Sequence, residues 1–270
     1  MKISDVEKLA SIYLDGIKSY KTMCDEILKK DTKINNELFL LLLAVFDSME
    51  TLAILSRYNK MRDSYVISRV IYETTVNILL ILSTDFESMD EMNVYTQNEI
   101  NQEPARSIAI DSEAVFLTFD GKEHIVGFSK NNPFSVKNPR NWTKHNLKNS
   151  INLIDKKYGK IVSRSLMVAH LVIYRTSSNI AHGTLYGMLQ AMGLIHGKTI
   201  KEFSDISMVE HNSNVIATLL LTTLQSVYGI VYVITKEIDL KINHLEYYTN
   251  LEKLIKEGKK LFSKENKRKY

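Results

Sequence analysis

One stretch of the chain carries polar side chains at spacings that could do chemistry. Residues 171–188 read LVIYRTSSNIAHGTLYGM, in which Arg175 and His182 are seven residues apart. At about 100° per residue, these two side chains differ by about 20° in direction and lie two turns apart on one helix face. Three further polar residues continue this line: Ser178, Asn179 and Tyr186. The sequence therefore predicts a stripe of five polar side chains along one helix.

The residues around this stripe are apolar, so burial of a charged side chain among them costs free energy. Leu171, Val172, Ile173 and Ile180 predict that the helix is packed into a core. A charged Arg175 in such surroundings needs either a carboxylate or an anionic ligand as its partner.

A carboxylate is available on an earlier apolar segment. Glu73 follows Arg69 by four residues there. Arg before Glu is the less favourable order for a pair within one helix, which leaves Glu73 able to reach across to Arg175 or His182. On that interpretation the stripe is a structural network rather than a catalytic site.

Several classes of chemistry have no sequence signal. The chain has no Gly-rich phosphate loop of the Walker or dinucleotide type, and no Gly-x-Ser-x-Gly elbow. No Glu stands three residues before a His, and one cysteine, Cys24, with seven scattered histidines gives no zinc spacing. We therefore expect no metal and no cofactor.

The segment from Arg175 to His182 resembles a known signature. Arg, six intervening residues and His are similar to the Arg-x(4 to 6)-His motif of the HEPN superfamily of helical ribonucleases and nucleotide-binding domains. The pattern also looks like a family of uncharacterised bacterial helical proteins placed near HEPN, on five residues: Trp142, Tyr158, Tyr174, Ser178 and His182. The resemblance covers about residues 60–235. It departs from the common pattern at Thr176, where many active members carry Asn, Asp or His.

The resemblance implies a function and a set of roles. HEPN nucleases dimerise so that two Arg/His pairs face one cleft, and they cut RNA without metal by using the 2′-hydroxyl as nucleophile. His182 would be the acid/base and Arg175 the phosphate clamp, with Ser178 and Asn179 as orienting groups. The family context implies a toxin or phage-defence role, a homodimer, RNA as substrate and an antitoxin or other protein partner. The alternatives are a noncatalytic HEPN-like module that binds a nucleotide or protein, and an unrelated helical protein.

The elements that would position these residues are mostly helices. Hydrophobic periodicity and capping residues predict a bundle of seven to eight helices over about residues 4–30, 36–58, 62–83, 88–107, 143–158, 160–189, 207–238 and 243–262. The expected capping residues are Ser4 with Glu7, Asn35 or Asn36, Ser88 with Glu91, and Ser207 with Glu210. Residues 113–128 predict a β-hairpin around Asp120-Gly121.

This pattern predicts an all-α domain with a small insertion. We expect a single HEPN-like domain over residues 1–270, with a hairpin and loop insertion at 109–140 and a basic tail at 263–270. The best candidate boundary is the loop at 131–139, which holds two of the three prolines. Glycines 183, 187 and 193 favour a tight helix crossing or a dimer contact.

Composition excludes other classes of protein. The 270 residues are 44% hydrophobic and 24% charged with 10 Gly and 3 Pro, which excludes disordered and collagen-like chains. The net charge of +4 arises at the C-terminus, because residues 252–270 carry eight Lys or Arg and three Glu. The rest of the chain is therefore nearly neutral, and its charge does not indicate a nucleic-acid surface.

Two apolar runs bear on membrane insertion. The run 38–46 is too short to span a bilayer, and the uncharged run 211–235 carries Thr, Gln and Ser near its centre, which favours a buried core helix. Asp5 and Glu7 interrupt any signal-peptide core at the N-terminus. We therefore expect a cytoplasmic protein with no membrane segment.

Overall fold

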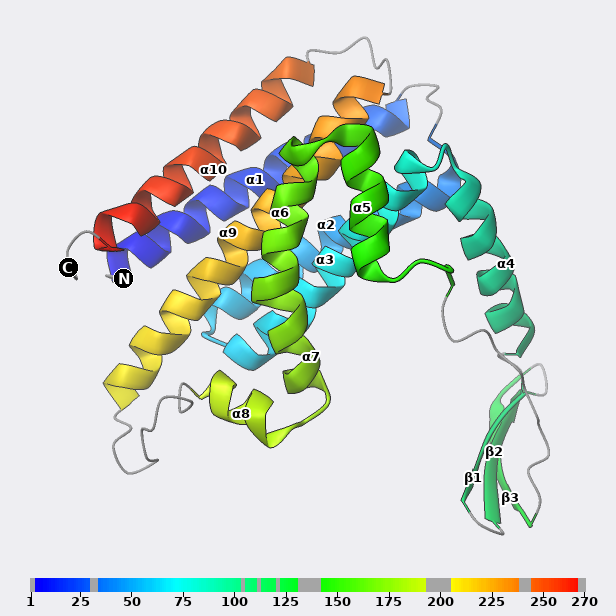
Figure 1. Ribbon diagram of the computed structural model, residues 1–270. Coiled ribbons are helices and arrows are strands. Elements are labelled where there is room, and N and C mark those ends of the chain that lie inside the picture. The colour runs from blue at the N-terminus through cyan, green and yellow to red at the C-terminus, as the bar shows by residue number, and fades with distance from the viewer. Residues whose placement is uncertain are drawn as a thin grey trace. The chain divides into compact units, whose positions relative to one another are not determined.

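The computed structural model describes residues 3–29, 34–102, 105–110, 113–119, 122–130, 142–192, 205–237 and 244–266. Most of them are helical, and a small antiparallel sheet of three strands accompanies the helices (Figure 1). This confirms the prediction of an all-α bundle with a small β insertion. Contacts divide the chain into two compact units, a helical unit of residues 1–83 and 147–270 and a smaller unit of residues 84–146.

The helical unit contains nine α-helical segments and one π-helical turn within the described ranges. These are α1 (Ile3–Lys29), α2 (Asn36–Arg57), α3 (Met61–Ser83), α5 (Leu147–Tyr158), α6 (Lys160–Ala169), the π turn η1 (His170–Tyr174), α7 (Arg175–Ala181), α8 (Leu185–Ala191), α9 (Asp205–Glu237) and α10 (His244–Asn266). The starts and ends of α1, α2 and α3 agree with the predicted helices to within one or two residues.

Helix α9 lies at the centre of this unit. It packs against α1, α3, α6 and α10, which surround it (Figure 1). Its side chains are buried on all sides between Leu219 and Val231, apart from Gln225. Its hydroxyl groups bond within the helix: Thr223 donates to the carbonyl oxygen of Leu219 at 2.8 Å. The hydroxyl-bearing residues of its uncharged run 211–235 are thus accommodated without any buried charge in that run.

Three helices are long and apolar enough to cross a membrane. They cover Asn36–Arg57, Met61–Ser83 and His211–Lys236, and the fold buries 33%, 56% and 72% of their most apolar windows respectively. The apolar run at 38–46 belongs to a helix of 22 residues, which as a whole is long enough to span. Length and composition alone therefore leave all three helices as possible membrane spans.

The predicted helix caps have mixed outcomes. Asn35 caps α2 as predicted, because its side-chain oxygen accepts a hydrogen bond from the amide of Leu38 at 3.0 Å. Helix α1 begins before Ser4, and α9 begins before Ser207. Both of these serines therefore lie inside the first helical turn, and neither is the residue that precedes its helix.

The smaller unit contains α4 (Glu87–Gln102) and the sheet. Its strands are β1 (Ala105–Ile110), β2 (Glu113–Phe119) and β3 (His124–Ser129), in the order β1-β2-β3 with antiparallel pairing. The predicted hairpin is confirmed as β2 and β3. The predicted helix to residue 107 was wrong at its end, since residues 105–110 pair with β2 instead. The expected turn at Asp120-Gly121 and the loop at 131–139 lie outside the described residues.

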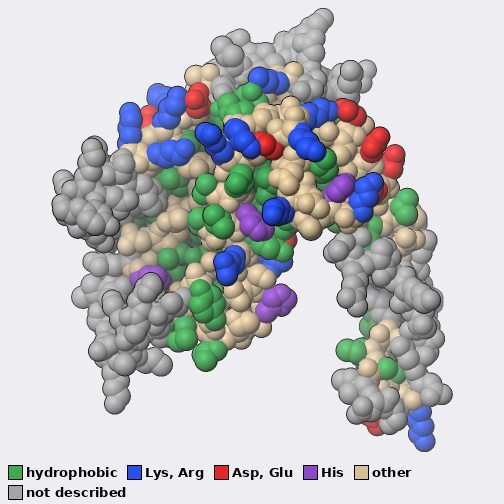
Figure 2. All heavy atoms as spheres, viewed as in Figure 1, with side chains coloured by type: hydrophobic (Ala, Val, Ile, Leu, Met, Phe, Trp, Pro, Cys, Tyr) green, Lys and Arg blue, Asp and Glu red, His purple; other side chains and the backbone are tan. Residues whose placement is uncertain are grey.

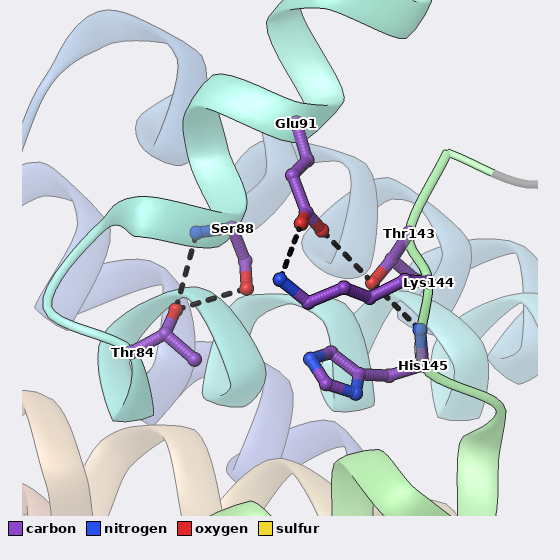
Figure 3. A network of polar contacts seen from close by, with 6 residues as sticks. All are labelled: Thr84, Ser88, Glu91, Thr143, Lys144 and His145. Atoms are coloured by element: carbon purple, nitrogen blue, oxygen red, sulfur yellow. Dashed lines mark hydrogen bonds and ion pairs between the residues drawn. The ribbon is translucent and has the colours of Figure 1, made fainter.

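A polar network in this unit replaces the capping box expected at Ser88 (Figure 3). Glu91 accepts hydrogen bonds from the ammonium of Lys144 at 3.1 Å and the hydroxyl of Thr143 at 3.2 Å. Thr84 accepts from the Ser88 amide at 3.2 Å and donates to its hydroxyl at 2.9 Å. The Lys144 bond lowers the pKa of Glu91. The carboxylate therefore holds the segment before α5 rather than the start of α4.

Candidate functional site

The predicted helix from residue 160 to 189 is interrupted twice in the structure. The π turn η1 separates α6 from α7, and a second break follows α7, where Gly183 adopts a left-handed conformation with φ of 63°. A π turn inserts one extra residue, which displaces the helix face beyond it by about 100°. Face assignments made for one continuous helix therefore do not extend across these breaks.

Arg175 and His182 both lie at the surface of α7. Arg175 is the first residue of the helix and His182 follows its last residue; both side chains are exposed. The residues that α7 buries are instead Thr176, Ser177 and Ile180. The expectation that Arg175 is buried among apolar neighbours was wrong, because that face of α7 points to solvent.

The other members of the stripe are arranged differently from the prediction. Ser178 and Asn179 lie half-buried between Arg175 and His182, but the Asn179 amide donates to the backbone carbonyl of Arg175 at 3.1 Å. Tyr186 is on α8 beyond the helix break, so it does not continue the stripe along one helix. Arg175, Ser178 and Asn179 lie on α7, and His182 caps its C-terminal end.

Glu73 does not reach across to the stripe. Its carboxylate pairs within α3 with Arg69, at 3.1 Å from Nε to Oε1. Among the described residues, no ion pair involves Arg175 or His182. The predicted contact of Glu73 with Arg175 or His182 was wrong, since the local pair forms in spite of its less favourable order.

A cluster of aromatic and charged side chains lies where α3 meets the π turn. The Arg69 guanidinium lies over the ring of Tyr174, at 4.8 Å from its centroid. Tyr174 stacks on the imidazole of His170 with 4.9 Å between centroids, and Nδ1 of His170 lies 3.1 Å from the Tyr72 hydroxyl. Burial lowers the pKa of His170.

Sequence reasoning did not single out this cluster. Its one sequence signal is the spacing of four residues between His170 and Tyr174, which places two rings on one helical face. The contribution of Tyr72 depends on tertiary packing of α3 against η1. Because π turns often occur at functional sites, this cluster is a second candidate functional site beside the Arg175 and His182 pair.

Helix α8 is anchored to α7 by a small set of contacts. The Thr184 hydroxyl donates to the carbonyl oxygen of Asn179 at 3.0 Å and accepts from the amide of Gly187 at 3.0 Å. Thr176 is buried and accepts from the Gln190 side chain at 3.1 Å. The residue that departs from the family pattern therefore holds α8 in place. Gly193 lies outside the described residues.

The exposed pair offers one proton-transfer group and one anion-binding group in each chain. Seven residues at 1.5 Å per residue place the backbones of Arg175 and His182 about 10 Å apart, a distance that a phosphodiester between the two side chains could bridge. Within the described ranges, no three His, Cys, Asp or Glu side chains are grouped to hold a metal ion.

No family model matches the sequence, and no curated protein or solved structure shows significant similarity to the chain.

Proposed function

We propose that the protein is a metal-independent endoribonuclease of the toxin or phage-defence kind, with Arg175 as phosphate clamp and His182 as acid/base. The observation that carries this proposal is that both side chains are exposed at the two ends of α7, with no carboxylate paired to either among the described residues. An Arg without an internal counterion is available to an external phosphate, and histidine is the side chain that most often acts as a general acid or base.

The reaction proceeds by attack of the RNA on itself. An imidazole removes the proton of a 2′-hydroxyl, the 2′ oxygen attacks the adjacent phosphorus, and the bond to the 5′ oxygen breaks as that oxygen gains a proton. The products are a 2′,3′-cyclic phosphate and a 5′-hydroxyl. The Arg175 guanidinium stabilises the charge that develops on the phosphoryl oxygens.

This chemistry requires two proton transfers on opposite sides of the phosphorus. One His182 removes a proton, and the leaving oxygen must receive one from another acid. A homodimer that faces two α7 segments across one cleft supplies the second imidazole. The active form in this proposal is therefore a homodimer, with RNA held between the copies.

Cleavage of labelled RNA in EDTA tests the proposal. The wild-type protein is expected to cut RNA to 2′,3′-cyclic phosphate ends, and His182→Ala and Arg175→Ala to lower the rate by about a hundredfold or more. His124→Ala is the matched control, because His124 is an exposed histidine on β3 in the smaller unit. No cleavage by the wild type, or equal cleavage by His182→Ala, would refute the nuclease.

Two contacts favour a second candidate function, a noncatalytic module that uses the same stripe to bind a nucleotide or protein. Thr176 is engaged with Gln190, and the Asn179 amide is engaged with the Arg175 carbonyl. Thr176 is therefore buried beneath α8, away from a phosphate at the surface, and Asn179 has one amide N–H left to donate. RNA binding that Arg175→Ala weakens, together with no cleavage at any protein concentration, would support this module and exclude the enzyme.

A further inference from the structure

A groove on the helical unit is separate from the Arg175 and His182 pair. It lies between α6, α9 and α10 and has a volume of about 530 Å³, within the range of ligand-binding cavities of about 300–1,000 Å³. Figure 2 shows Lys and Arg side chains gathered over this region with hydrophobic side chains between them. The groove is lined by residues from the three helices, and Glu252 is the one acid among the described residues that line it.

Four basic side chains form the rim of the groove: Lys160, Arg164, Lys256 and Lys259. Lys256 pairs with Glu252 at 2.8 Å, and Lys160 pairs with Asp155 outside the groove. Arg164 and Lys259 form no ion pair with any described residue, and both are exposed. The hydrogen bond from Lys160 lowers the pKa of the Asp155 carboxyl beside the groove, and the charge of Arg164 lowers it further. Within the groove, four cations face one carboxylate, Glu252, so the rim has a net positive charge.

The floor of the groove is largely apolar. Ile161 and Val168 from α6, Tyr228 from α9 and Ile255 from α10 line it. Gln225 is the one residue of α9 between Leu219 and Val231 that is not buried. The groove therefore combines an apolar floor with a cationic rim, which suits a ligand with an acyl chain and an anionic headgroup.

Exposed apolar side chains also follow the groove residues along the chain, at the end of α6 and in η1. Met167 directly precedes the groove residue Val168 and is 53% exposed, and Leu171 is 69% exposed. A small soluble ligand in the groove would leave both side chains in water. A lipid bilayer would cover them while its headgroups meet the rim, as at other basic and apolar membrane-contact surfaces.

We propose that this groove, with the exposed apolar residues beside it, docks the protein on a membrane surface by binding an anionic phospholipid. Arg164 and Lys259 contact the phosphate of the headgroup, and the apolar floor receives part of an acyl chain. Met167 and Leu171 enter the interface beside it. The association is peripheral and does not depend on the proposed nuclease.

Co-sedimentation with lipid vesicles tests this docking surface. The full chain is expected to bind vesicles of phosphatidylcholine and phosphatidylglycerol and to remain in solution with phosphatidylcholine alone. The double variant Arg164→Glu, Lys259→Glu should weaken binding by about thirtyfold or more, because each basic residue near an anionic surface contributes about fivefold. Leu171→Gln should weaken binding at unchanged net charge, because it removes an apolar contact.

A matched control separates a local effect from the change in overall charge. Arg62→Glu with Lys148→Glu makes the same change in net charge at exposed positions of α3 and α5, outside the groove, and should bind vesicles like the wild type. Circular dichroism melts of every variant establish that each is folded. The double variant Arg164→Gln, Lys259→Gln, which neutralises the same charges, provides a second measurement if charge reversal disturbs folding.

Four outcomes would overturn the proposal. The first is binding to phosphatidylcholine vesicles as tight as binding to vesicles that also contain phosphatidylglycerol. The second is that the control pair weakens vesicle binding as much as the Arg164 and Lys259 variant does. The third is that the protein binds monomeric dodecyl phosphate but no vesicles. The fourth is that the Arg164 and Lys259 variant loses RNA binding but keeps vesicle binding, which would assign the rim to nucleic acid. RNA cleavage in the same variants reports separately on Arg175 and His182.

Discussion

The hydroxyl of Tyr72 lies 3.1 Å from Nδ1 of His170 and joins α3 to the π turn. The same imidazole stacks on Tyr174, the residue that precedes Arg175. The cluster therefore holds in place the residue that directly precedes α7. Support of this kind behind an exposed site limits the freedom of the side chains that would meet a substrate.

Stability is expected to fall as the solution is acidified through the titration range of His170. Burial lowers the pKa of this imidazole below 6.5, the value of a free histidine side chain. The unfolded chain therefore binds a proton at a higher pH than the folded chain, and the free energy of unfolding decreases below about pH 6.5. It levels off once the folded-state imidazole is protonated as well.

Urea unfolding at a series of pH values measures this dependence. His170→Phe keeps the ring stacked on Tyr174 but removes the titrating group, so its unfolding free energy should change less between neutral and acidic pH. His182→Gln is the control, because it removes an exposed imidazole and should keep the slope of the wild type. Equal slopes in His170→Phe and the wild type would contradict the prediction.

Arg69 should contribute more to stability than its partner Glu73. Both side chains are partly exposed, at 23% and 36%, so the ion pair contributes less than about 1 kcal/mol. Arg69→Met loses this pair and the contact with the Tyr174 ring, which together amount to about 1–2 kcal/mol. Glu73→Gln should cost less than Arg69→Met, as measured by chemical denaturation.

The Glu73 variant also tests the geometry of the exposed pair. Because Glu73 is held by Arg69, its neutralisation should leave the NMR chemical shifts of the His182 ring unchanged. A carboxylate in contact with the imidazole would change those shifts when it is removed. A clear change in the His182 ring signals in Glu73→Gln would therefore show that the carboxylate reaches the site.

Local sequence patterns determine much of the helical framework. The polar residue Asn35 before an apolar run predicts the start of α2, and the uncharged run around Gln225 predicts the central helix α9. These features depend on neighbouring residues and on the period of hydrophobic side chains, which a single sequence displays directly.

The parts that could not be predicted depend on tertiary contacts. Residues 170–174 read HLVIY, which contains no residue that breaks a helix, and the π turn there coincides with packing of His170 against Tyr72. The extra residue displaces the faces of α6 and α7, so exposure of Arg175 could not be derived from a regular helical period. The pairing of β1 with β2 is likewise a nonlocal contact.

If the protein is cytoplasmic, as the sequence leads us to expect, an alkaline wash without detergent should release it from cell membranes. Exposed Asp47 and Glu50 lie on α2 with exposed Leu40 and Ile54, and a carboxylate at the bilayer centre costs about 2.5–3.5 kcal/mol. Fractionation of expressing cells, with an alkaline carbonate wash of the membranes, should place the protein in the supernatant. Retention in the washed pellet until detergent is added would show that the apolar helices span the membrane.

Gly187 is expected to be indispensable for the packing of α8 on α7. A Cβ at this position would lie 2.5 Å from the backbone carbon and oxygen of Asn179, atoms that cannot rotate away. Gly187→Ala should therefore cost about 1–3 kcal/mol or detach α8, seen as a lower melting temperature or as new protease cleavage around residue 185. Leu185→Ala, at a side chain that is 75% exposed, should stay within about 0.5 kcal/mol of the wild type. Because Thr184 lies two residues after His182 and bonds to Asn179, detachment of α8 should also lower RNA cleavage. A stable Gly187→Ala protein with wild-type protease resistance would contradict this close approach.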